Sequence, residues 1–110
     1  MLTLGAPTIT PFSFPRNLRE GMRAGITCFI TDGDLPITIQ WLKDGEPIAS
    51  HMDVTTNTLN EFTSTLAINS IKPRNNGNYT CVARNTAALT NYTAQLLVNG
   101  KFLMHSFTNS

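Results

Sequence analysis

The most reactive side chains in this sequence are the thiols of Cys28 and Cys81, the only two cysteines among its 110 residues. Two such thiols either form a disulfide or stay free, in which case one can act as a nucleophile. Trp41, the only tryptophan, lies between them in the sequence, and Tyr79 precedes the second cysteine by two positions. These spacings favour a disulfide across a hydrophobic core, with the indole packed on the sulfurs. Two buried free thiols beside an ordinary core tryptophan are the alternative.

The same spacings are those of an immunoglobulin sandwich, in which strands B and F are joined across two sheets. In that fold Tyr79 would donate its hydroxyl to the backbone at the corner between strands E and F. Trp41 and Tyr79 are therefore the expected core partners of the Cys28–Cys81 bond. Such a bond persists in an oxidising compartment, which indicates a secreted or cell-surface protein. Intracellular muscle domains share this fold with reduced cysteines, so the fold alone leaves the compartment open.

Composition predicts a single binding domain. A net charge of +1 with 14% charged residues provides no field for binding DNA, RNA or anionic lipid. No apolar run is long enough to span a membrane, and the first residues lack a basic leader region. We expect one domain over residues 7–99, with extensions 1–6 and 100–110 that are foreign sequence or linker. Any membrane attachment would come only through a parent receptor.

Alternating apolar residues predict the strands and their inward faces. Edge strands are expected at residues 8–12 and 15–21, short strands near Ile48 and Val54, and a polar loop at residues 56–60. Lys43, Asp44 and Gly45 predict a hairpin turn after the strand that carries Trp41. The side chains expected to face the core are Ala24, Ile26, Cys28, Ile30, Ile37, Ile39, Trp41, Phe62, Ser64, Leu66, Ile68, Ile71, Tyr79, Cys81, Ala83, Tyr92, Ala94, Leu96 and Val98.

No motif for catalysis, cofactor binding or metal binding appears. Asp32 and Asp34 supply only two nearby carboxylates, too few for a calcium loop. His51 and His105 form no pair at metal-ligand spacing, and there is no serine hydrolase motif or phosphate-binding loop. The sequence thus predicts neither an enzyme nor a cofactor or small-molecule substrate, and favours binding.

Three segments, residues 41–45, 66–71 and 77–85, resemble an I-set immunoglobulin domain of a neural adhesion protein. Residues 11–15 and 32–36 resemble more narrowly the arthropod Dscam (Down syndrome cell adhesion molecule) family, especially its variable domains. The resemblance implies an all-β, I-set two-sheet β-sandwich with one inter-sheet disulfide. The sequence departs from the family at Asn75, where aspartate is usual. We therefore expect neutral hydrogen bonds to replace the buried ion pair that is common in this fold.

The resemblance also implies homophilic recognition, in which identical isoforms pair, on an extracellular part of a cell-surface membrane protein. By strand parity, the outward side chains of strands B and E are small or apolar, and Phe29 among them is better explained if a partner covers it. We expect two copies to meet antiparallel about a two-fold axis through the sheet of strands A, B, E and D. The expected interface residues are Arg23, Gly25, Thr27, Phe29, Thr63, Thr65 and Ala67.

Two alternatives to this interface remain. The outward residues could be no more than β-favouring residues on a solvated sheet. The domain would then be a structural I-set spacer or a heterophilic receptor domain without self-association.

The sequence contains two complete N-x-[S/T] sequons, at Asn78 and Asn91. Parity directs both asparagines outward, from strands F and G. We expect glycans there, on the sheet opposite the expected interface, although such sequons also go unused.

Overall fold

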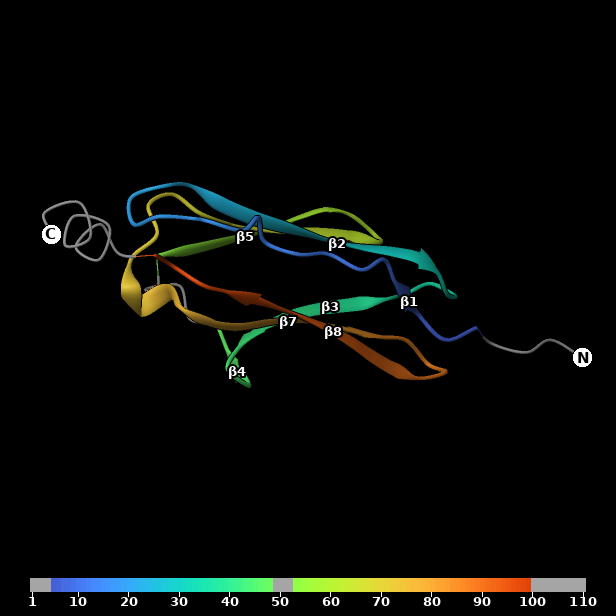
Figure 1. Ribbon diagram of the computed structural model, residues 1–110. Coiled ribbons are helices and arrows are strands. Elements are labelled where there is room, and N and C mark those ends of the chain that lie inside the picture. Colours follow the sequence, from blue (N-terminus) through green and yellow to red (C-terminus); the bar gives the residue numbers. More distant parts are fainter. Residues whose placement is uncertain (1–4, 49–52, 100–110) are drawn as a thin grey trace, which may run out of the picture.

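The computed structural model describes residues 5–48 and 53–99, which form two four-stranded antiparallel sheets packed face to face (Figure 1). The described residues contain no α-helix, only a short 3₁₀ turn, η1, at Pro73–Asn75. The sheet orders are β1-β2-β6-β5 and β4-β3-β7-β8. The strands are β1 (Thr8–Ile9), β2 (Ala24–Asp32), β3 (Thr38–Lys43), β4 (Glu46–Pro47), β5 (Val54–Asn60), β6 (Thr63–Ile68), β7 (Gly77–Arg84) and β8 (Leu89–Leu96). The predicted all-β sandwich is confirmed.

Strand β2 shows why alternation predicts this fold so well. Its even positions from Ala24 to Ile30 are buried and its odd positions are exposed. Because successive side chains of a strand point to opposite faces, one face of β2 joins the core while the other meets solvent. The inward residues of β7 follow the same pattern, and Tyr79, Cys81 and Ala83 are all completely buried.

The disulfide between Cys28 and Cys81 is confirmed and joins β2 to β7 across the two sheets. Trp41 lies directly opposite Cys81 in the pairing of β3 with β7. Its indole Nε1 donates a hydrogen bond to Ser64 Oγ at 2.9 Å, in the facing sheet, and Ser64 Oγ donates in turn to Asn57 O at 3.2 Å. The two sheets are thus held together by a covalent bond and a polar contact, in addition to apolar packing.

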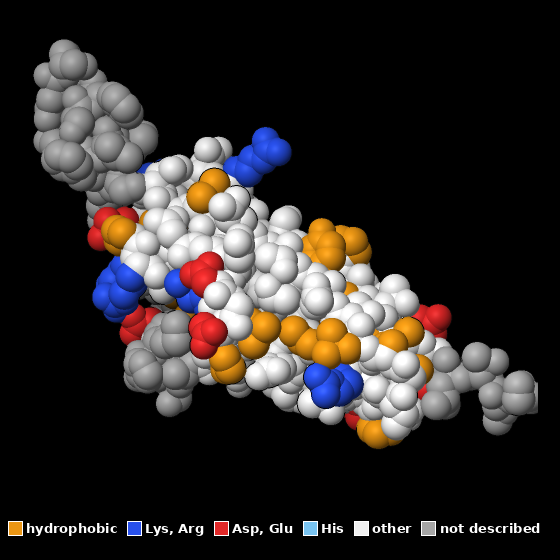
Figure 2. All heavy atoms as spheres, turned by 90° about the horizontal axis from the view of Figure 1, so that it is seen from below, with side chains coloured by type: hydrophobic (Ala, Val, Ile, Leu, Met, Phe, Trp, Pro, Cys, Tyr) orange, Lys and Arg blue, Asp and Glu red, His pale blue; other side chains and the backbone are white. Residues whose placement is uncertain are grey.

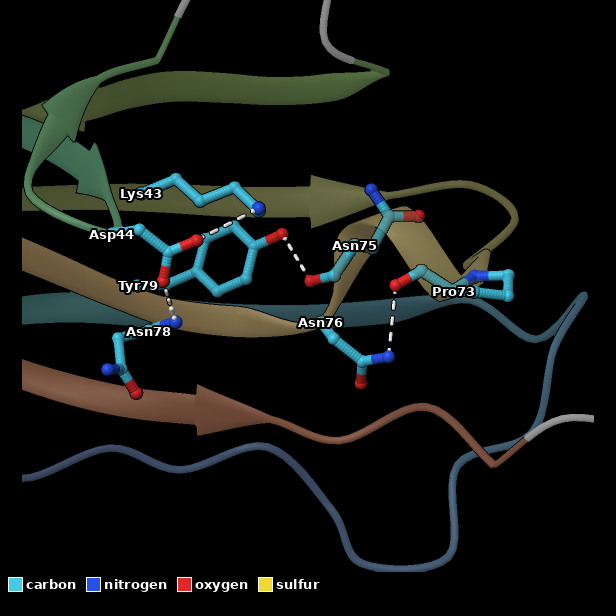
Figure 3. A network of polar contacts seen from close by, with 7 residues as sticks. All are labelled: Lys43, Asp44, Pro73, Asn75, Asn76, Asn78 and Tyr79. Atoms are coloured by element: carbon cyan, nitrogen blue, oxygen red, sulfur yellow. Dashed lines mark hydrogen bonds and ion pairs between the residues drawn. The ribbon is translucent and has the colours of Figure 1, made fainter.

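The corner between β6 and β7 depends on Tyr79 and the turn η1 (Figure 3). The Tyr79 hydroxyl donates to Asn75 O at 2.8 Å, as expected for a tyrosine two residues before the second cysteine. The buried Asn75 side chain accepts from Lys72 N at 2.7 Å, so neutral hydrogen bonds hold this corner. Desolvation by burial is the main cause that raises the pKa of Tyr79 to about 12.

The hairpin between β3 and β4 is fastened to β7 by Asp44 (Figure 3). Asp44 N donates to Asn78 O at 2.8 Å, and Asp44 Oδ1 accepts from Asn78 N at 2.9 Å. Asp44 and Gly45 have φ values of 49° and 84°, as the predicted Asp-Gly turn requires. Gly77 is needed here because a Cβ at that position would lie 2.7 Å from Asp44 Oδ2.

Three predictions about the elements were wrong. Residues 56–60 were expected to be a loop, but they belong to β5, an edge strand that pairs with β6 and is exposed on both faces after Val54. Residues 15–21 form no strand; they contain one parallel bridge, between Arg19 and Asn99. The edge strand expected over residues 8–12 is shorter than predicted, because β1 covers only Thr8–Ile9. The short strand expected near Ile48 is confirmed as the two-residue β4, Glu46–Pro47.

Candidate interaction surface

The outer face of the β1-β2-β6-β5 sheet carries the residues predicted to form an interface. Cross-strand pairing arranges them in rows, each with one residue from β2, one from β6 and one from β5. The three central rows are Gly25–Ala67–Thr55, Thr27–Thr65–Asn57 and Phe29–Thr63–Asn60. We call this surface the BED face. The structure thus brings the sequence-predicted residues of β2 and β6 together and adds β5, which was not expected to contribute.

The three rows differ in height. Gly25 and Ala67 are exposed and have almost no side chain, so these two positions of the first row lie low. We call them the hollow, and Thr55 borders them on β5. In the third row Phe29 is 39% exposed and packs edge-on against Phe62, which is 37% exposed, with ring centroids 5.5 Å apart. These two rings form a ridge, and between ridge and hollow lies the flat row of Thr27 and Thr65.

Phe62 and Thr63 correct the sequence-based assignment of this face. Phe62 was expected in the core, but it precedes β6 and lies in the turn after β5. Its backbone N–H donates to Asn60 Oδ1 at 2.9 Å, an Asx turn that frees its side chain from strand parity. Asn60 was the sequence signal that could have indicated this turn. Thr63 was expected to be an interface residue, but it is only 6% exposed and offers a partner almost no surface.

The aromatic ridge continues into a cleft toward the β2–β3 loop. The cleft is lined by Phe29, Leu35 and Phe62, among others, and Leu35 is 50% exposed. The three central rows contain no charged side chain. Arg23 lies beyond the hollow at one end of β2 and Asp32 ends the strand at the other. A large neutral surface with exposed aromatic rings is suited to binding another protein.

The outer face of the β4-β3-β7-β8 sheet differs in character. Figure 2 looks onto this side and shows a mostly white surface of backbone and uncharged, non-hydrophobic side chains, with several hydrophobic side chains across it and most acidic and basic side chains near one end. Asn78 on β7 and Asn91 on β8 are both exposed here, on the side that parity predicted. The threonine hydroxyls of their two sequons, Thr80 Oγ1 and Thr93 Oγ1, share a hydrogen bond of 2.7 Å across the strands.

Two ion pairs lie outside the BED face. Arg74 in η1 pairs with Asp53, just before β5, and the pairing lowers the pKa of Asp53. Asp44 accepts a backbone hydrogen bond from Asn78 and pairs with Lys43 at 3.2 Å; together these contacts lower the pKa of Asp44. Arg74, Asp53 and Asp44 are exposed and Lys43 is half-buried, and ion pairs at the surface add little to stability.

The described part of the chain brings no three acidic, histidine or cysteine side chains together as a metal site. His51 and His105 lie outside the described residues, as do extensions 1–4 and 100–110. Within residues 5–48 and 53–99 no helix is long and apolar enough to cross a membrane.

Comparison with known proteins identifies the family. A family model described as an immunoglobulin domain matches residues 6–85. The cell adhesion molecule DSCAM of the rat, Rattus norvegicus, is 49% identical over 92 residues, which cover 84% of this chain and 4% of that protein. The chain therefore spans a small fraction of the length of its relatives.

Solved structures agree with this assignment. The crystal structure of the Dscam1 Ig7 domain, isoform 5, is 35% identical with a TM-score of 0.82, covering 86% of this chain and 97% of that one. The titin I-band fragment I67–I69 is 30% identical with a TM-score of 0.78, covering 89% of this chain and 34% of that one. Immunoglobulin domains of cell adhesion molecules are a non-enzymatic family, in keeping with a binding surface in place of an active site. The chain belongs to the immunoglobulin domain family and, within it, to the Dscam group.

Proposed function

We propose that this domain is an extracellular recognition module that pairs with an identical copy through the BED face. The observation that carries the proposal is the order of the three rows: an aromatic ridge and a small-residue hollow lie at equal distances on either side of a flat threonine row. Phe29 and Gly25 are each two residues from Thr27 along β2. A rise of about 3.3 Å per residue therefore sets ridge and hollow each about 7 Å from the central row.

This arrangement is self-complementary about one particular axis. If a two-fold axis runs along the Thr27–Thr65–Asn57 row, in the plane of the interface, the strands of the two copies run antiparallel. The Phe29–Phe62 ridge of each copy then lies over the Gly25–Ala67 hollow of the other. A two-fold contact of this kind is reciprocal, so each complementary fit occurs twice.

The chemistry of the BED face favours the same pairing. Because the central rows are uncharged, association would not have to desolvate an unpaired charge, which is a large cost at protein interfaces. Burying two exposed phenylalanine rings in each copy supplies apolar area, and aromatic anchors contribute much of the binding energy at many interfaces.

The extracellular location rests on the disulfide and on the family. A bond between two fully buried cysteines is typical of proteins that fold in an oxidising compartment. Relatives that contain a similar domain are named cell adhesion molecules. We propose that residues 7–99 form the recognition domain and that membrane attachment is a property of the parent protein.

Sedimentation equilibrium of single variants tests the pairing. Thr65 lies on the proposed axis, so Thr65→Asp or Thr65→Lys would place two like charges against each other and should give monomers. Mixing the two variants should restore association, because opposite charges then meet across the axis. Gln40→Lys, on the exposed outer surface of β3, is the matched control and should leave the dimer intact. A dimer that survives Thr65→Asp but dissociates with Gln40→Lys would show that the β4-β3-β7-β8 sheet makes the contact instead of the BED face.

A structural spacer is the second candidate, and the similarity to the titin I-band fragment favours it. A spacer needs the sandwich and its disulfide but no self-complementary face. Wild-type chain that stays monomeric at every concentration tested would support the spacer or a heterophilic receptor domain over homophilic pairing.

A further inference from the structure

We propose that Asn91 carries an N-linked oligosaccharide whose first sugars lie in a shallow groove beside it on the outer face of the β4-β3-β7-β8 sheet. The groove is lined by Thr38, Gln40, Val82 and Arg84. This inference rests on the extracellular location proposed above, because the modification needs passage through a secretory compartment.

The register of the sheet places Asn91 at the edge of this groove. Asn91 on β8 pairs with Val82 on β7, and Val82 pairs with Gln40 on β3. The three residues form one row across the sheet, and parity directs all three side chains outward. A sugar attached to the exposed Asn91 side chain therefore reaches Val82 first and Gln40 next.

The groove has the mixed chemistry that sugars require. Val82 provides a small apolar platform for the C–H face of a pyranose ring. Around it, the Thr38 hydroxyl, the Gln40 carboxamide and the Arg84 guanidinium offer donors and acceptors for sugar hydroxyls. Apolar surface with a few convergent polar groups is the usual composition of a ligand site.

Asn78, the other sequon asparagine, lies elsewhere on the same face. It pairs with Gln95, four positions along β8 from Asn91, so the two asparagines are about 13 Å apart along the strand direction. Its backbone is bonded to Asp44 in the β3–β4 turn, away from the groove. A glycan on Asn78 would therefore stand apart from the groove, which makes Asn78 a matched control.

Transfer of the sugar must precede folding of this hairpin. In the folded domain Thr93 is bonded to Thr80, and β8 pairs with β7 along its whole length, so the sequon is not presented as a free segment. The donor would be a lipid-linked oligosaccharide pyrophosphate. Asn91 Nδ2 forms a bond to the anomeric carbon, the bond from that carbon to the pyrophosphate oxygen breaks, and the Nδ2 proton is lost to the pyrophosphate.

The site is tested on the chain secreted from insect cells behind an added leader. Peptide N-glycosidase should lower the intact mass and convert Asn91 to aspartate, which peptide mass mapping detects. Asn91→Gln should abolish this conversion, and Asn78→Gln should leave it in place. An Asn91 peptide that stays asparagine after enzyme treatment of wild-type chain would overturn the proposal. That outcome would leave the dimer test of Thr65 unaffected, so the two proposals fail separately.

The groove contact has its own readout. In isotope-labelled glycoprotein, nuclear Overhauser effects should connect the Val82 methyl protons to the first sugars. They should persist in Asn78→Gln and vanish in Asn91→Gln. Glycan resonances that show no such effect to Val82 or Gln40 would contradict the groove assignment even if Asn91 is modified.

Discussion

Tyr79 stabilises the corner between β6 and β7 through a single hydroxyl. The ring is completely buried, and the hydroxyl donates to Asn75 O at 2.8 Å. A phenolate would be poorly solvated in the core and could not donate this hydrogen bond. Burial therefore raises the pKa of Tyr79 to about 12. The contribution of this residue to stability thus depends on pH.

Tyr79→Phe should lower the free energy of unfolding by about 1 kcal/mol at neutral pH, because one buried hydrogen bond is lost. The sign of the pH effect follows from the raised pKa. The stabilisation is fully present below pH 10, the pKa of an unfolded tyrosine, and is lost as pH rises through about 12. Over this pH range the free energy of unfolding of the wild-type chain should fall by up to about 2.7 kcal/mol. That of Tyr79→Phe should not show this fall. Urea denaturation at several pH values measures the difference in free energy of unfolding between the two proteins. A difference that stays constant up to pH 12 would contradict this account.

Asp44 should make the hairpin sensitive to acid. The Asn78 hydrogen bond and Lys43 lower its pKa below the usual 3.8, so its stabilisation is present above that value and is lost as pH falls through the lower, folded pKa. Asp44→Asn keeps the positive φ and an acceptor but loses the charge. Melting temperatures of the variant should fall less than those of wild-type chain below about pH 4. Glu46→Gln on the same hairpin is the control and should follow wild type.

At the scale of elements, one side chain joins three loops at the end of the sandwich near the β7–β8 turn. Asn85 Nδ2 donates to Gly5 O at 2.7 Å and to Asp34 O at 3.0 Å. Its Oδ1 accepts from the backbone N–H groups of Ala87 and Ala88, at 2.9 and 3.0 Å. The N-terminal segment, the β2–β3 loop and the β7–β8 turn are therefore fixed relative to one another.

Asn85→Ala should destabilise the domain by about 1 kcal/mol, because it removes hydrogen bonds between groups that are exposed or only partly buried and that can bond to water instead. Hydrogen exchange should accelerate at the amides of Ala87 and Ala88 and remain slow in β2 and β6. Asn85→Asp separates the two halves of the network, because it keeps the acceptor but removes the Nδ2 donors. In that variant the amides of Ala87 and Ala88 should stay protected from hydrogen exchange, while exchange in the N-terminal segment should accelerate. Equal exchange in all three proteins would refute this role.

The alternation of apolar and polar residues predicted the strands that have one face in the core. It failed for the strand of which neither face is buried. Strand β2 was predicted residue by residue because every second side chain is apolar and buried. Strand β5 offers no such pattern: after Val54 all its residues are exposed, and it is held by backbone pairing to β6. Parity identified most of the outward-facing residues of β2 and β6, but it cannot show that Phe62 leaves the strand or that Thr63 is covered.

At the scale of the whole molecule, the two outer faces have separate proposed roles. The BED face is bare, neutral and self-complementary, whereas the opposite face carries both sequons. A glycan on the opposite face would block flat packing there and leave the BED face as the accessible surface. Proposed recognition and proposed modification are therefore compatible because the sandwich directs them to opposite sides.

The neutrality of the BED face predicts that homophilic pairing is insensitive to salt. In the proposed antiparallel dimer, Arg23 of one copy lies over Thr31 of the other, four residues on either side of Thr27, so Arg23 does not lie directly over a charged residue of β2. Raising sodium chloride from about 0.05 to about 0.5 M, which shortens the Debye length severalfold, should change the dissociation constant by less than about twofold. The mixed pair of Thr65→Asp with Thr65→Lys is an internal control, because its opposite charges attract across the axis and its association should weaken in the same salt series. A wild-type dimer that dissociates steeply with salt in sedimentation equilibrium would mean that charged side chains outside the BED face make the contact.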